Sequence, residues 1–354
     1  MTAAAIGLPA VLATVAAGAA ARDADPAGAF PEDAIAALER AGVMGASAGG
    51  DGLPYAEELA LLRAVGAADA GVARILDGHL NAIERLRAQA PPALAEAELA
   101  AIARGELRAG VWGADPGPGE GEPARLRGGV ISGVKTFCSG AGGLQRALVL
   151  VRHDGAGPPL AAWVDLMQPG TVEIDRAWFQ GAGMRSSASH RVVFDRAPVL
   201  AVLGEPGALT RQPWFARDAV RTAGTWAGAA DSAVEDALDR LAARPNGGDL
   251  EALAAGRLLA WQEAIGLWLA HAATVLDGGP EDQLAADAAA LARVGIADAA
   301  RAILDEAERA LGSRPAATGA ALDRAARDLR LFLLQHRLEP ILARTGAAAL
   351  EARR

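Results

Sequence analysis

The spacing of apolar residues changes twice along the chain. In the first part, apolar positions recur three and four residues apart, as in helices that bury one face, over residues 31–43, 55–88 and 92–107. The first 22 residues are also rich in alanine and predict a helix. We therefore expect residues 1–108 to form a helical domain.

A different pattern begins near residue 109. Glycine and proline are dense over residues 111–123, which excludes a long helix there. Short β-branched or alternating apolar runs follow, separated by turn residues, at 129–137, 147–152, 160–167, 171–175 and 191–199. This pattern predicts a small β-sandwich or β-barrel domain over residues 109–208.

Helical spacing returns in the last part of the chain. Four long stretches show it, and helix breakers separate them: 214–244, 250–276, 283–311 and 321–343. Long helices joined by short links are what an antiparallel bundle requires. We expect a four-helix bundle over residues 209–354, and hence an α+β protein with helices on both sides of a β domain.

Composition narrows the possible functions. The 354 residues carry a net charge of −9 and only 4% aromatic residues, which argues against a nucleic-acid partner. A single cysteine excludes an intramolecular disulfide framework and a cysteine-based zinc cluster. The apolar start has no basic residues before it and is interrupted by Gly7, Pro9 and Gly18, so we expect neither a signal peptide nor a membrane span. A cytoplasmic protein with no membrane partner is the expectation.

The candidate reactive residues say little when taken one by one. The five histidines show no metal-binding spacing, and no P-loop or nucleophile elbow is present. Cys138 lies in an apolar run and is best interpreted as a small buried side chain. His336 lies on the apolar side of a predicted helix, which favours a structural histidine, and Asp218 beside Arg221 is typical of a surface ion pair.

Three phrases, taken together, are more specific. They are SGVKTFCSGAGGLQRALVLV (132–151), GAGMRSSASHRVVFDRAPV (181–199) and RAARDLRLF (324–332). With the helix–strand–helix order, they resemble the acyl-CoA dehydrogenase superfamily of flavoproteins over nearly the whole chain. The resemblance implies FAD between the β domain and the bundle, a small-molecule substrate such as an acyl thioester, and a homodimer or homotetramer formed through the bundle.

The resemblance also assigns residues to the cofactor. Phe137, Cys138 and Ser139 match the segment that lies against the flavin ring, with the Ser139 hydroxyl near N5 and Phe137 in place of the usual tryptophan. The strand that binds the pyrimidine end of the flavin is matched by Val111, Gly113 and Ala114. The groups that bind the phosphates are matched by Arg244, Gly312 and Ser313. Glu120 stands where the family has a serine that seats a CoA thioester, and its charge should oppose a phosphorylated ligand.

The catalytic base departs most from the family pattern. The usual place for the glutamate holds His336, and the alternative place, on the first helix of the bundle, holds Asp218. Three hypotheses stay open: α,β-dehydrogenation of an acyl thioester with Asp218 as base and His336 assisting, a flavin-dependent monooxygenase with His336 near the flavin, and a degenerate partner subunit without flavin. The sequence does not distinguish FAD from FMN.

Overall fold

The computed structural model describes residues 7–155, 157–245, 248–335 and 337–354. Their contacts divide the chain into two compact units. The sheet unit comprises the described residues up to Leu53 together with Arg74–Gly181 and Arg185–Trp214, and the helical unit comprises Pro54–Ala73, Ala182–Met184 and Phe215–Arg354. The predicted order of helices, sheet and helices along the chain is confirmed. The division into three domains at residues 108 and 208 stays a prediction.

The sheet unit is built on seven strands in the order β1-β4-β5-β7-β3-β2, with β6 paired to β7. The strands are β1 (Ala109–Trp112), β2 (Arg125–Arg127), β3 (Val130–Cys138), β4 (Arg146–Val151), β5 (Leu160–Asp165), β6 (Val172–Asp175) and β7 (His190–Val202). All pairs are antiparallel except β1 with β4. Trp112, Trp163 and Phe194 are buried in this unit, so three of the few large aromatic residues supply its core.

Helices complete the sheet unit. They are α1 (Leu8–Ala24), α2 (Glu32–Arg40), α4 (Ala70–Gln89, in this unit from Arg74 on) and α5 (Pro92–Ala103). Arg108, just before β1, binds Glu32 and Glu39 of α2 with N–O distances of 2.5–2.7 Å. His79 of α4 hydrogen-bonds Met44 and Ala109, which ties this helix to the start of the sheet.

The stretch 55–88 is two helices and not one. Helix α3 (Tyr55–Ala68) ends at Asp69, whose backbone is extended with φ −162°. The Asp69 carboxylate then accepts the N–H groups of Gly71 and Val72 at 3.0 and 3.1 Å, so it caps the start of α4. Apolar spacing alone does not reveal this break, because both helices continue the same pattern.

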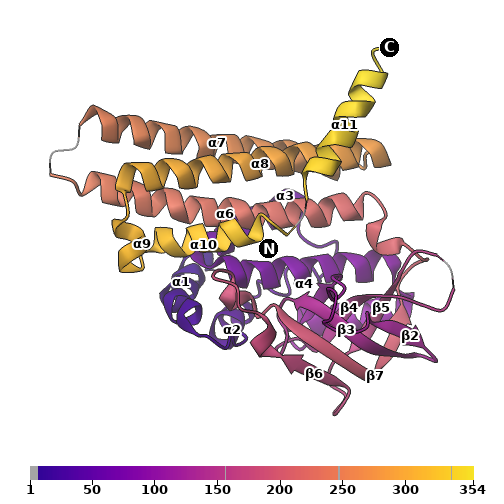
Figure 1. The fold of residues 1–354 in the computed structure, drawn as a ribbon. Coiled ribbons are helices and arrows are strands. Elements are labelled where there is room, and N and C mark those ends of the chain that lie inside the picture. The colour runs from indigo at the N-terminus through magenta and orange to yellow at the C-terminus, as the bar shows by residue number, and fades with distance from the viewer. Residues whose placement is uncertain (1–6, 156, 246–247, 336) are drawn as a thin grey trace. The chain divides into compact units, whose positions relative to one another are not determined.

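The helical unit contains three long helices side by side, which Figure 1 shows: α6 (Trp214–Ala242), α7 (Asp249–Asp277) and α8 (Asp282–Leu311). Helices α3, α9 (Arg314–Thr318), α10 (Ala321–Phe332) and α11 (Glu339–Glu351) complete it. The predicted fourth helix over 321–343 is wrong in length, since α10 ends at Phe332 and α11 begins at Glu339. No helix among the described residues is long and apolar enough to cross a membrane.

Glycines let two helices of this unit approach closely. A Cβ atom on Gly228 of α6 would lie 2.1 Å from the Arg63 carbonyl oxygen, and one on Gly66 of α3 would lie 2.8 Å from the Thr225 oxygen. Helices α3 and α6 therefore cross with their backbones nearly in contact. The Trp226 ring of α6 packs edge-on against Phe332 of α10, with centroids 6.0 Å apart.

Candidate functional site

In the sheet unit, the end of β3 carries the three residues matched to the flavin ring. The pairing of β3 with β7 is irregular between Lys135 and Cys138, and Phe137 adopts φ 51°, a value that non-glycine residues rarely take. The Phe137 ring is 56% exposed. Strained backbone of this kind collects at functional sites.

Cys138 points the opposite way and is fully buried. Burial raises the pKa of its thiol far above the usual value, so the thiolate that a nucleophile needs does not form. The interpretation of Cys138 as a small buried side chain is confirmed.

Ser139 is held at several atoms. Its carbonyl oxygen accepts the indole N–H of Trp112 at 2.9 Å, and its Oγ lies 2.8 Å from Oγ of Ser189. The Ser189 hydroxyl in turn lies 2.7 Å from that of Ser187. The serines of the phrase 181–199 lie in a short 3₁₀ helix (Arg185–Ser187) and just before β7, and Ser189 reaches the predicted flavin-binding segment.

An aromatic residue that the sequence analysis missed stands beside Phe137. The Trp178 ring meets Phe137 edge-on, with centroids 4.9 Å apart and an angle of 84°. Its indole N–H donates to Glu120 at 2.8 Å. The Gly117 N–H also donates to the Glu120 carboxylate, and these two bonds hold the pKa of Glu120 below its usual value. Trp178 had no motif to reveal it; only its rarity as a large aromatic residue set it apart.

The residues matched to the pyrimidine end lie on and just after β1. This strand is at the edge of the sheet and pairs with β4 only, among the described strands. The Gly113 carbonyl accepts the Lys135 ammonium at 3.0 Å, and the Ala114 carbonyl accepts the Thr136 N–H at 3.1 Å. Of the three predicted residues, Val111 is the one whose backbone lies on the edge strand itself.

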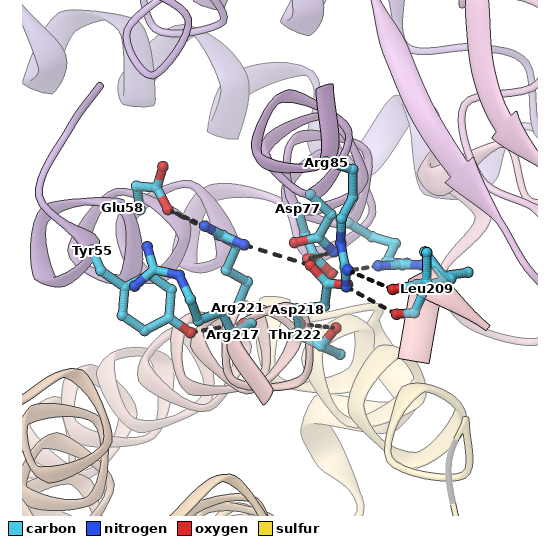
Figure 2. A network of polar contacts seen from close by, with 12 residues as sticks. Tyr55, Glu58, Asp77, Arg85, Leu209, Arg217, Asp218, Arg221 and Thr222 are labelled. Atoms are coloured by element: carbon cyan, nitrogen blue, oxygen red, sulfur yellow. Dashed lines mark hydrogen bonds and ion pairs between the residues drawn. The ribbon is translucent and has the colours of Figure 1, made fainter. Parts of the chain in front are cut away.

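In the helical unit, Asp218 belongs to a buried charge cluster (Figure 2) and not to a surface ion pair. The Arg221 side chain is 1% exposed; it lies 3.6 Å from Asp218 and donates two hydrogen bonds, at 2.7 and 2.9 Å, to Glu58 of α3. The Asp218 side chain is 14% exposed. The expectation of a surface pair was wrong because α3, far away in sequence, covers this face of α6.

The neighbouring turn of α6 is bound to α3 as well. The Tyr55 hydroxyl donates to the Arg217 carbonyl at 2.7 Å, and the Arg217 guanidinium lies 3.9 Å from the centre of the Tyr55 ring. Figure 2 shows Tyr55 and Glu58 on α3 facing these residues of α6. The charges around Asp218 therefore also join two helices.

The residues matched to the phosphates come together at one end of the helical unit. Arg244 donates to the Ala310 carbonyl at 2.7 Å, two residues before Gly312, and lies 3.0 Å from Glu251. Gly312 has φ 72° and ends α8, while its N–H donates to the Glu308 carbonyl at 2.8 Å. Ser313 precedes α9. The Arg244 guanidinium is therefore already paired with a carboxylate.

His336 lies outside the described residues. The Arg-Asp pair before it has a clear role within the helical unit: the Asp328 carboxylate accepts the Met184 N–H, and Arg327 donates to the Ala182 carbonyl at 2.6 Å. A Cβ atom on Gly183 would lie 2.3 Å from the Arg327 carbonyl oxygen. Two of the three phrases that carry the resemblance thus bind one another.

Solved structures share this architecture. KijD3, in complex with FMN and a dTDP-linked amino keto sugar, matches at TM-score 0.83 and 24% identity, covering 97% of this chain and 92% of that one. Dibenzothiophene monooxygenase TdsC from Paenibacillus sp. A11-2 matches at 0.82 and 20%, covering 98% and 97%. Butyryl-CoA dehydrogenase from Megasphaera elsdenii matches at 0.81 and 20%, covering 97% of both chains.

This chain has the acyl-CoA dehydrogenase fold. At 20–24% identity these likenesses establish the fold alone. No protein-family model matches the chain, and no curated protein sequence matches it. The reaction must therefore be argued from the residues of this chain.

The sheet unit offers groups that fit a flavin. An isoalloxazine ring needs an apolar or aromatic face, a hydroxyl or amide donor for N5, and backbone groups for its pyrimidine edge. The exposed, strained Phe137, the fixed Ser139 hydroxyl and the edge strand β1 supply these three kinds of group. Their assignment to the cofactor stays a prediction.

Proposed function

We propose that this chain is a flavin-dependent monooxygenase that acts on a small substrate other than a CoA ester. The observation that carries this choice is the state of Asp218, the candidate base for dehydrogenation. Its carboxylate lies 3.6 Å from the buried guanidinium of Arg221, which also binds Glu58. A base for an α-proton must take up that proton, and protonation of Asp218 would remove its attraction to the buried Arg221 guanidinium.

Glu120 supports the same choice. It occupies the place of the serine that seats a CoA thioester, and its two hydrogen bonds favour the charged carboxylate. A fixed negative charge disfavours a ligand that carries phosphates nearby. The dibenzothiophene monooxygenase and methanesulfinate monooxygenase among the similar folds act on substrates without CoA, which is consistent with this proposal.

For the cofactor we favour FMN over the predicted FAD. Arg244, matched to the FAD diphosphate, is already paired with Glu251, and the Gly312 N–H is already bonded to Glu308. FMN, with one phosphate and no adenine, makes fewer demands on these groups. KijD3 and TdsC were both solved with FMN, which supports this choice.

In this proposal the residues of the sheet unit orient the cofactor and shield it. When bound, reduced flavin would supply the two electrons with which O₂ places one oxygen atom in the substrate and the other in water. Ser139 would donate its hydroxyl hydrogen to the ring, Phe137 would cover an apolar part of it, and Val111 would bind its pyrimidine edge. Trp178 would hold Phe137 in place.

Dehydrogenation of an acyl thioester is the second candidate. The similarity to butyryl-CoA dehydrogenase over 97% of both chains favours it, as does the presence of a carboxylate, Asp218, at the alternative base position. Asp218 and His336 keep their predicted catalytic roles under this candidate.

We also propose that the chain assembles into a homodimer or homotetramer through α7. This helix exposes five large apolar side chains, which are Leu250, Leu253, Leu259, Trp261 and Leu267. A helix that is apolar on most sides is usually covered. The mass of the protein in solution tests this, and a Leu267→Glu variant should lower it.

One series of measurements separates the hypotheses. Purified protein is titrated with FMN and with FAD and followed by absorbance and fluorescence. Substrate oxidation that requires a flavin reductase and O₂ supports the monooxygenase, and anaerobic bleaching of the flavin by an acyl-CoA that is lost in Asp218→Asn supports the dehydrogenase. Protein that stays colourless with both flavins rejects both enzymes and favours the degenerate partner subunit.

A further inference from the structure

The hydroxyl groups of Ser139, Ser189 and Ser187 form one continuous chain. The Oγ–Oγ distances are 2.8 Å between Ser139 and Ser189 and 2.7 Å between Ser189 and Ser187. Exposure falls along it, from 9% at Ser139 and 7% at Ser189 to 0% at Ser187. The chain therefore leads from the predicted flavin-binding segment into the core of the sheet unit.

Unusual backbone brings these hydroxyls together. In an extended strand, residues two apart lie about 6.6 Å from each other on one face. Ala188, between Ser187 and Ser189, instead has φ 45°, and this turn brings the two hydroxyls into contact. Phe137, two residues before Ser139, has the same rare conformation at φ 51°. Both backbone segments that carry the three hydroxyls thus contain a strained residue.

Backbone hydrogen bonds hold the two segments against each other. The Gly140 N–H donates to the Ser187 carbonyl at 2.9 Å, and the Ala141 N–H donates to the Ala188 carbonyl at 3.2 Å. The Trp112 indole fixes the Ser139 carbonyl from the other side. These bonds fix the backbone on both sides of the three hydroxyls and so fix the positions from which the hydroxyls meet.

A chain of hydroxyls has a direction. Each serine hydroxyl can donate one hydrogen and can accept hydrogen bonds at its lone pairs. If the outermost hydroxyl is to donate to a ligand, each hydroxyl behind it must therefore donate to the next one outward. When Ser187 donates to Ser189 and Ser189 donates to Ser139, the Ser139 hydrogen is left to point away from the core. In that arrangement the two inner serines orient the Ser139 hydroxyl as a donor.

We propose that Ser187 and Ser189 are positioning residues that set the Ser139 hydroxyl as a donor toward the bound flavin. This inference rests on the proposed function, because it takes Ser139 as a flavin ligand. It adds two residues that the family match did not assign. Neither touches the cofactor; both act through Ser139.

The test compares Ser139→Ala, Ser189→Ala and the double variant. Each is titrated with FMN by quenching of flavin fluorescence, and the midpoint potential of the bound flavin and the thermal midpoint of the protein are measured alongside. Ser189→Thr keeps a hydroxyl and serves as the rescue. Ser132→Ala is the matched control, since Ser132 is also on β3 but accepts the Arg196 N–H at the distant end of that strand.

Removal of one hydrogen bond to the flavin should raise the Kd for FMN about fivefold. We expect Ser139→Ala and Ser189→Ala each to show this change and to shift the flavin potential in the same direction. The double variant should again show about fivefold and not about twenty-fivefold, because both substitutions remove the same interaction. Ser189→Thr and Ser132→Ala should keep the affinity and potential of the wild type.

The outcomes separate this inference from the function beneath it. Wild-type protein that binds no flavin overturns both. Wild-type binding with a Ser189→Ala variant that keeps its affinity and potential overturns the hydroxyl chain alone, even when its thermal midpoint falls. If Ser189→Ala does not fold, Ser189→Cys, with its weak donor, takes its place, and the same fivefold change is expected.

Discussion

The surroundings of Ser139 in the sheet unit and of Asp218 in the helical unit differ in charge. In the sheet unit, neutral groups gather around Ser139, and strained residues such as Phe137 expose an aromatic face. In the helical unit, the polar groups near Asp218 are charged, buried and paired between α3 and α6. The exposed ring of Phe137 can contact a ligand, whereas the charges around Asp218 pair with one another and join two helices.

This contrast bears directly on the reaction. Both units contain residues that the family resemblance assigned to catalysis or to the cofactor. The surroundings of Asp218 favour a structural role, and those of Ser139 and Phe137 favour a ligand. A substitution should therefore change mainly stability around Asp218 and mainly flavin binding around Ser139 and Phe137.

The largest expected effect is in the helical charge cluster. Arg221→Met should lower the free energy of unfolding by about 3–5 kcal/mol, because it leaves the buried Glu58 carboxylate without this guanidinium. Urea unfolding measures the change. Arg301→Met is the control: its pair with Asp298 is exposed and should matter by less than about 1 kcal/mol. Equal losses in the two variants would contradict a structural role for the cluster.

The close crossing of α3 and α6 predicts the next effect. Gly228→Ala should destabilise the protein by about 2–3 kcal/mol, because the new Cβ would meet the Arg63 carbonyl oxygen at 2.1 Å. Gly256→Ala, at an open position within α7, should instead stabilise by about 0.5–1 kcal/mol. Thermal unfolding of both variants tests the pair, and a shift of the same sign in both would argue against the crossing.

Phe137 tests the other side of the comparison. Phe137→Gly relieves the positive φ but loses the contact with Trp178, so the net change in stability should be less than about 1 kcal/mol. Affinity for FMN should fall about tenfold, because the aromatic face is gone. Phe137→Trp should retain it. Flavin titration and thermal unfolding are measured together, and a large loss of stability with unchanged affinity would assign Phe137 to the fold.

The smallest effect concerns pH. Burial lowers the pKa of His190 below its usual 6.5, so as the pH falls this ring takes up a proton later in the folded protein than in the unfolded chain. Stability from this group is therefore complete above pH 6.5 and is lost as the pH falls below it. His190→Gln should therefore lose less stability than the wild type between pH 7 and 5, which urea unfolding at the two pH values measures. The pKa of His79 is also lowered by burial. His79 is present in both the wild type and the variant, so it adds the same pH dependence of stability to each.

Much of this fold could be predicted from sequence because its patterns are local. The strands β3 to β7 follow from short β-branched runs between turns, and the burial of Cys138 follows from its apolar neighbours. The break between α3 and α4 at Asp69 was not predicted, because a capping side chain within continuous helical spacing leaves the apolar pattern unchanged.

The site was less predictable because it depends on contacts between distant segments. Glu58 lies 163 residues from Arg221, and no local pattern indicates that the two meet. Trp178 reaches Phe137 only because the loop after β6 returns to the end of β3. The family resemblance indicated Ser139, but the hydroxyls behind it became visible only through the turn at Ala188.

The position of Gly183 restricts how this sequence can evolve. Its Cα faces the backbone of α10, which no side-chain substitution can move away, and the neighbouring amide is held by Asp328. Any descendant that keeps this helix in place must keep a glycine there as well. Homologous sequences should therefore retain or lose the glycine and the aspartate together, although 144 residues separate Met184 from Asp328.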